Sequence, residues 1–385
     1  MILRDGIAAP VANGMHKNIF HHRRGDLDAI SRMPIMFATI AFCVLAPLGW
    51  PAESGVSGWA KFEPPDQKTI LIIGQTREEF ADYVKTARAG QPGGYMFYTS
   101  LKHLEGLTSP WKGAGCTDAG VEDLQDWADN YPESVGQVGL YVVDQLSSIN
   151  SGALDTNIKT LAEILRKTNK PILMRIGYEF DGEWNAYEPE AYVAAWRRIV
   201  DIFRGKKVGE QSIVPVSNVA FVWHSAVWRT FHNHPIAAWY PGDNYVDWAA
   251  ISWFAWSDKE SRNVSETARS RLAAFAKEHN KPLMIAESAP KSYYAPARSD
   301  SWGGWFEPLF AWIRRNNVKA FSYINQNWDA QPMWHDPSCK NPTDWGDTRV
   351  QTPSSTVLKA WQKTVKERRF LGAGPQLYKA IGFPK

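Results

Sequence analysis

The sequence of 385 residues predicts a single (β/α)8 barrel, in which eight parallel strands form a closed inner sheet and helices surround it. Short apolar or β-branched runs recur along the chain, and longer segments with helical periodicity separate them. This alternation is typical of βα units and a parallel sheet. A doubly wound open sheet is the alternative, but it needs a Gly-rich phosphate loop after the first strand. Residues 74–79, GQTREE, supply none.

Eight runs are predicted to be the strands of the barrel, because each is too short for an amphipathic helix and is rich in residues that favour strands. They are residues 69–74, 94–98, 138–143, 172–178, 219–224, 246–254, 283–287 and 318–325. The clearest helices between them are residues 76–87, 154–168, 189–203, 265–279 and 305–316. Several carry apolar residues at three- and four-residue spacing. Pro189 and Glu190 match the preference for proline and an acid in the first turn.

The N-terminal part resembles an export signal. Residues 34–50 carry no charge, follow an arginine, and lead into small and polar residues, but the run is short for a membrane span. We therefore expect a secreted or periplasmic protein with no stable membrane insertion after signal removal. Residues 1–52 would be the extension and signal, with Met33 as a possible true start, and residues 60–385 a single catalytic domain. An uncleaved anchor is the alternative.

The charge of the chain argues against a nucleic-acid partner, and its cysteine content leaves open whether a disulfide forms. The net charge of +3 comes from nearly balanced acids and bases with no block of like charges, so nucleic-acid binding is not indicated. Cys43 lies in the apolar run, which leaves Cys116 and Cys339 in the exported part. Export would permit a disulfide between them, and two unpaired thiols fit the sequence equally well.

Two glutamates end predicted strands that are apolar up to the acid. Glu179 closes the fourth strand and Glu287 the seventh, and a barrel brings both to its C-terminal face. A lone strand-end acid is usually an exposed ion-pair partner. Two acids at the ends of buried runs favour a functional pair, because burial penalises a carboxylate that nothing pairs or uses. Two such carboxylates are the equipment of a glycosidase: one donates a proton to the leaving oxygen, and the other attacks the anomeric carbon or activates water.

Residues 175–184, RIGYEFDGEW, resemble the fourth-strand pattern RPxHEMNGxW of glycoside hydrolase family 26 without a gap. This is a retaining family of the (β/α)8 clan. The resemblance implies that Glu179 is the acid/base, Glu287 the nucleophile, Arg175 a polar support inside the site and Trp184 a platform for sugar stacking. It also implies a β-linked polysaccharide substrate of the β-mannan or β-1,3-xylan type and no cofactor or metal.

Three positions depart from the family pattern. Tyr178 stands where the family has histidine and Asp181 where it has asparagine. Trp253 or Phe254 replaces the sixth-strand tyrosine that orients the nucleophile. A phenol at position 178 still donates a hydrogen bond, but its reach differs from that of an imidazole. These departures bear on substrate choice more than on reaction type, and the Tyr-Glu-Phe-Asp variant resembles β-1,3-xylan-active as well as mannan-active members.

Further polar and aromatic residues follow the predicted strands, and 19 tryptophans offer flat faces on which sugar rings stack, although tryptophan is also a common core residue. His224 ends the fifth strand, and an amide and an indole follow the eighth. Gln75 and Tyr98 end the first two strands as further lining residues. The predicted substrate-binding set is Arg175, Tyr178, Asp181, Trp184, His224, Trp253, Asn325 and Trp328. The other interpretation is a satisfied core histidine and asparagines that cap backbone groups.

Two competing functions remain. His232 and His234 have the HxH form of a metal-dependent hydrolase or deacetylase, but they lie in a predicted loop with no obvious acidic partner. A non-catalytic glycan-binding barrel would use the tryptophans alone, and the two glutamates argue against it. We therefore expect a secreted or periplasmic, endo-acting glycoside hydrolase, and the resemblance to family 26 implies that it retains the anomeric configuration.

Overall fold

The computed structural model describes residues 60–107, 123–208, 212–227, 234–254, 259–331, 333 and 345–384, with the side chains of residues 259–265 excepted. The predicted signal at residues 34–50, Cys116, Cys339 and His232 lie outside the described residues. The domain boundaries, the disulfide and the export signal therefore stay predictions.

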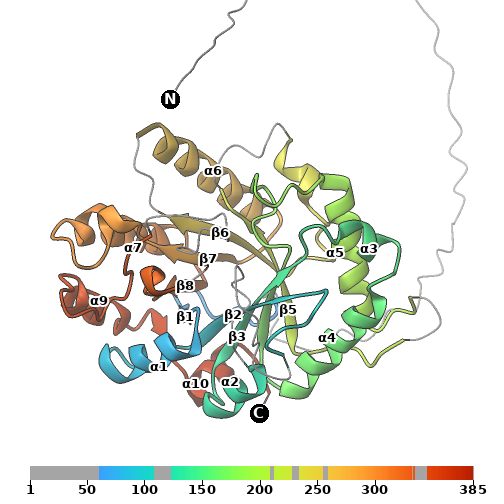
Figure 1. Cartoon of the computed structure of the whole chain (residues 1–385), viewed down its shortest axis with the longest axis horizontal. Helices are drawn as coiled ribbons and strands as arrows, with labels where there is room; N and C mark the ends of the chain where they lie inside the picture. The colour runs from blue at the N-terminus through green and yellow to red at the C-terminus, as the bar shows by residue number, and fades with distance from the viewer. Residues whose placement is uncertain are drawn as a thin grey trace, which may run out of the picture. The chain divides into compact units, whose positions relative to one another are not determined.

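A closed barrel of eight parallel strands forms the centre of the molecule, which confirms the predicted fold class (Figure 1). Each strand pairs with the next, and β1 pairs with both β8 and β2, so the sheet closes on itself. The strands are β1 Thr69–Gly74, β2 Gly94–Ser100, β3 Val135–Tyr141, β4 Ile172–Ile176, β5 Val219–Ser225, β6 Trp248–Phe254, β7 Leu283–Ala289 and β8 Ala320–Ile324. All eight overlap the predicted runs. β3 begins earlier than the predicted run of residues 138–143, and β4 ends at Ile176, so Glu179 lies in the loop beyond it rather than at the end of the strand. A two-residue strand, β9 (Phe370–Leu371), adds to β1.

Helices surround the barrel and include the five predicted ones. The described helices are α1 Arg77–Thr86, α2 Leu124–Asn130, α3 Leu146–Asn150, α4 Asp155–Thr168, α5 Pro189–Phe203, α6 Lys259–Glu278, α7 Glu307–Arg315, α9 Leu358–Val365 and α10 Pro375–Ala380. α1 begins after Thr76, whose side chain accepts a hydrogen bond from the backbone of Glu79 as an N-cap. α5 begins at Pro189 as predicted. A π-helical turn, Trp302–Phe306, precedes α7 and accounts for its later start.

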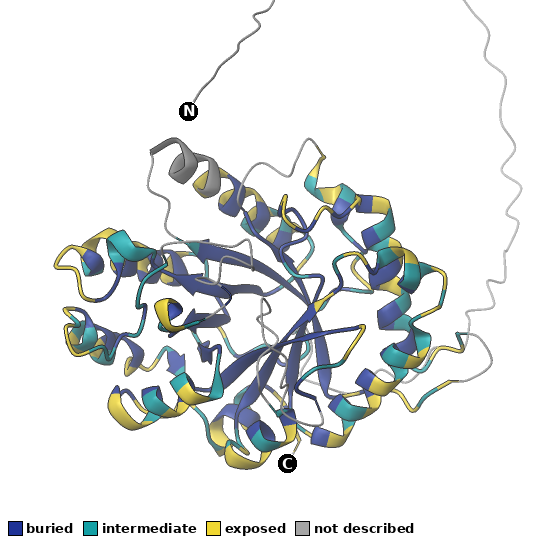
Figure 2. Ribbon diagram, viewed as in Figure 1, coloured by how far each residue is buried: buried dark blue, intermediate teal, exposed yellow. Residues whose placement is uncertain are grey.

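Alternation along the strands separates two apolar layers. One set of side chains points into the barrel and the other packs under the surrounding helices. The strands are therefore buried on both faces, and their ribbons are dark blue in Figure 2. On β6, Trp248 and Ala250 belong to the inner layer, whereas Ala249, Ile251 and Trp253 belong to the outer one. A strand of this barrel therefore places every second residue toward the centre.

A β-bulge in β7 interrupts this alternation beside the centre of the barrel. Ile251 of β6 pairs with Ile285, but the next residue, Ser252, pairs with Glu287, which leaves Ala286 as the extra residue. Ala286 belongs to the inner layer, so strict alternation would turn Glu287 outward. The extra residue shifts the alternation of the strand by one position, so the Glu287 carboxylate points into the barrel interior instead.

Apolar side chains close the end of the barrel at which the strands begin. Phe62 lies edge-on to Phe383, with ring centroids 5.6 Å apart, and the Trp248 indole donates to the carbonyl of Lys61 at 2.7 Å. Tyr98, Arg175, His224 and Ser252 lie toward the opposite end, in the C-terminal halves of their strands. Separately, none of the described helices has the length and apolar character needed to span a bilayer.

Candidate active site

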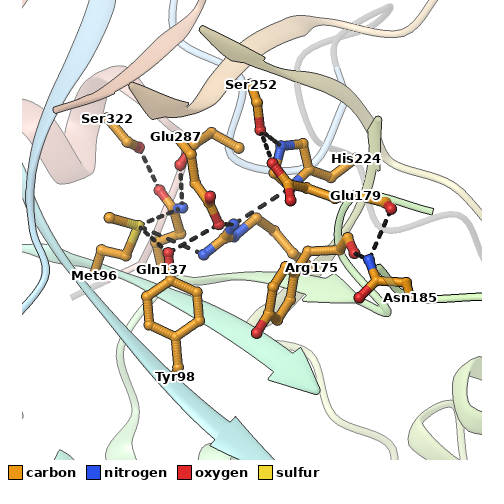
Figure 3. Close-up of polar contacts among 12 residues, drawn as sticks. Met96, Tyr98, Gln137, Arg175, Glu179, Asn185, His224, Ser252, Glu287 and Ser322 are labelled. Carbon is orange, nitrogen blue, oxygen red and sulfur yellow. Dashed lines mark hydrogen bonds and ion pairs between the residues drawn. The ribbon is translucent and has the colours of Figure 1, made fainter. Parts of the chain in front are cut away.

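Five inward-pointing side chains from five strands meet at the C-terminal end of the barrel (Figure 3). They are Tyr98 of β2, Arg175 of β4, His224 of β5, Ser252 of β6 and Glu287 of β7. Glu179, from the loop that follows β4, joins them through Ser252. The structure thus brings both predicted catalytic acids into one hydrogen-bonded cluster on the face where barrel enzymes carry their active sites.

The Glu287 carboxylate is held through one oxygen only. Oε1 accepts a hydrogen bond from the Tyr98 hydroxyl at 2.8 Å and a second from Nη1 of Arg175, with which it also forms an ion pair. Oε2 accepts no hydrogen bond from the described residues. Two charge-assisted donors therefore orient the group and leave its second oxygen available for reaction.

Arg175 is fully buried and lies against two aromatic rings. Its guanidinium is 5.0 Å from the ring of Tyr98 and 5.1 Å from that of Tyr178, distances typical of cation–π contacts. Gly139 of β3 provides the space, because a Cβ there would lie 2.5 Å from Cδ1 of Tyr98 and 2.9 Å from Nη2 of Arg175. Only glycine permits this close approach.

Glu179 has a strained backbone that its neighbours hold in place. Its φ of 55° lies in the left-handed region, which is uncommon for a non-glycine residue and clusters at functional sites. The Asn185 amide donates to the carbonyls of Tyr178 and Glu179 at 3.0 and 2.9 Å. At the carboxylate, Oε1 accepts from Ser252 at 2.5 Å, and Oε2 accepts from the Trp184 indole at 3.1 Å.

The surroundings of Glu179 favour its protonated form. Burial raises the pKa of this carboxyl to about 8, and the charges of Glu287 and Asp181 act in the same direction. The hydrogen bond from Ser252 and the charge of Arg175 lower the pKa but do not outweigh burial. Glu179 therefore holds a proton near neutral pH, which is the state that a general acid requires.

His224 is buried between Arg175 and Ser252. Its Nδ1 lies 3.3 Å from Nη1 of Arg175, and its Nε2 lies 3.0 Å from the Ser252 hydroxyl. Burial and the neighbouring guanidinium charge hold the pKa of His224 well below its usual range, so the imidazole is neutral. The sequence left two interpretations of this side chain open, a contact with a sugar hydroxyl and a satisfied core histidine. Its described hydrogen bonds are to Arg175 and Ser252, and its contact with sugar stays a prediction.

The structure corrects the prediction for Trp253. Its indole packs outside the barrel, 5.5 Å from the Trp312 ring of α7 and 4.0 Å from the Arg269 guanidinium of α6. Alternation along β6 turns Trp253 toward the helices and its neighbour Ser252 toward the site. Trp253 therefore does not line the site as expected.

Three other predicted binding residues make hydrogen bonds that hold loops in place around the site. Asp181 accepts from Ser225 Oγ at 2.8 Å and from the Ala226 amide at 2.6 Å. Asn325 accepts from the Val350 amide at 2.9 Å. The Trp328 indole donates to Thr348 at 2.9 Å and stacks on Trp345. Their contact with sugar stays a prediction.

Trp184 and Tyr178 lie nearer to solvent. The Trp184 side chain is 52% exposed while its indole nitrogen reaches Glu179, so it combines an open aromatic surface with a place beside the acid. Tyr178 is half-buried and packs edge-on against Tyr98 at 5.4 Å. Both positions are compatible with the predicted sugar contacts, which stay predictions.

Sequence reasoning missed Ser252, Asn185 and Gln137, a polar residue that supports β7. Gln137 of β3 donates to the carbonyl of Ala286 at 2.7 Å and accepts from Ser322 of β8, so it supports the bulge that turns Glu287 inward. A glutamine within an otherwise apolar run, VGQVGLY, was the available signal. Period-two alternation on the sixth strand was the signal for Ser252.

The metal alternative receives no support from the described part of the chain, where no three His, Cys, Asp or Glu side chains are grouped to hold an ion. His234 is described and lies edge-on to Trp239, but its predicted partner His232 is not described.

Comparison with known proteins agrees with this geometry. The profile of glycosyl hydrolase family 26 matches residues 122–319. The β-1,3-xylanase TXYA of a Vibrio species and a β-1,3-xylanase of an Alcaligenes species are both 30% identical to the chain over 338 residues. The match covers 83% of this chain in both cases and 69% and 68% of the two relatives.

A solved structure shares the fold. The modular endo-β-1,4-mannanase of Cellulomonas fimi superimposes with a TM-score of 0.58 at 16% identity, covering 85% of this chain and 80% of that one. By the family profile and the two sequence relatives, the chain belongs to glycosyl hydrolase family 26 and is a glycoside hydrolase.

Proposed function

We propose that the protein is an exported, endo-acting glycoside hydrolase that cleaves β-1,3-xylan with retention of anomeric configuration. Glu179 is the acid/base and Glu287 the nucleophile. The observation that carries this mechanism is the unequal treatment of the two acids: burial and a nearby like charge keep Glu179 protonated, whereas a guanidinium and a phenol bind Glu287. The two relatives named β-1,3-xylanase support the substrate.

In the first step, Oε2 of Glu287 attacks the anomeric carbon while Glu179 gives its proton to the glycosidic oxygen. The bond between the anomeric carbon and that oxygen breaks, its electron pair goes to the leaving hydroxyl, and a covalent glycosyl ester forms on Glu287. Tyr98 and Arg175 hold Oε1 throughout, so the attacking oxygen needs no reorientation.

The second step follows from the electrostatics of the first. Once Glu287 is esterified it carries no charge, and one of the two main causes of the raised pKa of Glu179 disappears. The ionised Glu179 then takes a proton from water, the water oxygen attacks the anomeric carbon, and the ester bond breaks. Glu287 regains its charge, and the sugar leaves with its original configuration.

The stereochemistry of the first product tests this proposal. When purified protein cleaves β-1,3-xylan in an NMR tube, the β-anomer of the new reducing end should appear first and mutarotate later. An initial α-anomer would mean inversion and would remove the nucleophile role from Glu287. β-Mannan and β-1,4-xylan in parallel test the substrate, and early release of long oligosaccharides tests endo action. N-terminal sequencing of the native extracellular product tests export.

A further inference from the structure

We infer that Arg175, His224 and Ser252 form a one-directional hydrogen-bond relay that fixes the oxygen of Glu179 on which the catalytic proton resides. The inference rests on the proposed role of Glu179 as acid/base. Arg175 also contacts Glu287 directly, whereas His224 and Ser252 act only through Glu179 and are positioning residues.

The direction of the relay follows from what each group can donate. An arginine guanidinium has no acceptor, so Nδ1 of His224, 3.3 Å from Nη1 of Arg175, must be the accepting nitrogen. The single proton of the neutral imidazole then lies on Nε2 and is donated to the Ser252 oxygen at 3.0 Å. The serine has one proton of its own, and it points to Oε1 of Glu179 at 2.5 Å.

This direction disfavours a proton on Oε1 of Glu179. A proton there would make the serine oxygen accept from both His224 and Glu179, and the serine's own proton, for which Oε1 is the acceptor, would be left buried without another acceptor among the described residues. The proton of the acid therefore resides on Oε2. Oε2 is the oxygen beside the half-exposed Trp184 indole, so the glycosidic oxygen must approach from the Trp184 side.

The relay also joins the two carboxylates. Nη1 of Arg175 donates to Oε1 of Glu287 and lies beside His224, so one guanidinium orients the nucleophile directly and the acid indirectly. Arg175 and His224 are fully buried and Ser252 is 2% exposed, which leaves little access for water to replace a missing member. Removal of the Ser252 hydroxyl should therefore leave the Glu179 carboxyl without the hydrogen bond that fixes its orientation.

The charges around Glu179 set the direction of the pH effect. Glu287 faces it from β7, Asp181 from its own loop and Arg175 from β4, while His224 on β5 is neutral. The Ser252→Ala substitution leaves these groups in place and removes a hydrogen bond that favours the ionised carboxylate. The pKa of Glu179 should then rise, and the alkaline limb of kcat/KM should move to higher pH.

The test compares two substrates that differ in their need for an acid. β-1,3-Xylan needs a proton on its leaving oxygen, whereas 2,4-dinitrophenyl β-1,3-xylobioside has a leaving group that departs without one. For Ser252→Ala, kcat/KM on the polymer should fall roughly 10-fold or more, a part of the ~10²–10⁴-fold that general acid catalysis contributes, and on the aryl glycoside by less than ~3-fold. Ser252→Thr keeps the hydroxyl and should restore the polymer activity and the alkaline limb.

Two further variants separate positioning from general structural damage. His224→Ala removes the donor to Ser252 and should give the same difference between substrates. Ser288→Ala removes a buried hydroxyl that donates to the carbonyl of Ser322 and should leave the alkaline limb unchanged. Equal losses on both substrates with an unmoved limb in Ser252→Ala would overturn the relay while leaving the proposed function intact. An initial α-anomer from the wild-type protein would overturn both.

Discussion

At the scale of single residues, two glutamates of the same chemistry acquire different properties from their partners. Glu179 lies among buried groups that keep its proton, and Glu287 accepts hydrogen bonds from a guanidinium and a phenol. The phenol is Tyr98 of β2. The sixth strand, where this chain lacks the orienting tyrosine of the family pattern, supplies Ser252 to the other acid instead. The second strand thus provides the donor that the sixth lacks.

Tyr98→Phe tests the orienting phenol. It removes the donor to Oε1 of Glu287 but keeps the ring beside Arg175. We expect kcat to fall roughly 10- to 100-fold, because a hydrogen bond to a charged group contributes about 1.5–3 kcal/mol. Tyr95→Phe is the matched control, since Tyr95 lies on the same strand, faces outward, and has a hydroxyl without a partner in the described structure. Equal activity of the two variants would contradict the role of Tyr98.

The raised pKa of Glu179 predicts the pH profile of the wild-type enzyme. Glu179 must be protonated to act as the acid, so kcat/KM should decline as pH rises through about 8. An unperturbed glutamate would place this decline near pH 4. Activity that falls at that lower pH, with the fold intact by circular dichroism, would remove Glu179 from the role of acid.

At the scale of elements, alternation and its interruption decide which side chains reach the site. Period-two alternation on β6 predicts Ser252 inside and Trp253 outside, so the error at Trp253 was avoidable from the sequence. The bulge at Ala286 could not be predicted from the sequence, because no glycine or proline marks it. Gln137, which donates to the carbonyl of Ala286, belongs to a different strand, β3. A strand-end acid thus predicts a position along the strand but not the face on which it lies.

Gly139→Ala tests the close packing between β3 and the site. The added methyl group would meet both Tyr98 and Arg175, and such overpacking typically costs about 1–3 kcal/mol of stability. We expect kcat to fall more than KM changes, because both donors to Glu287 shift. Gly303→Ala is the control, as nothing lies within 4 Å of a Cβ built there. Urea unfolding and kinetics of both variants measure the effect, and wild-type kcat in Gly139→Ala would contradict it.

At the scale of the whole molecule, apolar contacts that stabilise the barrel and polar residues of the candidate site lie at opposite ends of it. The end where the strands begin is closed by apolar contacts such as Phe62 with Phe383, and the other end holds the polar cluster. Strand number, strand positions and both acids could be predicted because each depends on local pattern. The anchoring of Asp181, Asn325 and Trp328 could not, because their partners become neighbours only in the folded chain.

The central claim is that Glu287 is the nucleophile of a double displacement in which Glu179 is the acid/base. Glu287→Ala should lose several orders of magnitude in turnover while still binding the polymer, with Glu183→Gln, an exposed acid in the same loop as Glu179, as the active control. In the direct measurement, the Glu287→Ala protein is incubated with azide and 2,4-dinitrophenyl β-1,3-xylobioside. The product is identified by mass spectrometry and NMR. The account predicts restored turnover and an α-glycosyl azide. A folded Glu287→Ala protein that azide does not rescue, or that cleaves as fast as the wild type without it, would contradict the account.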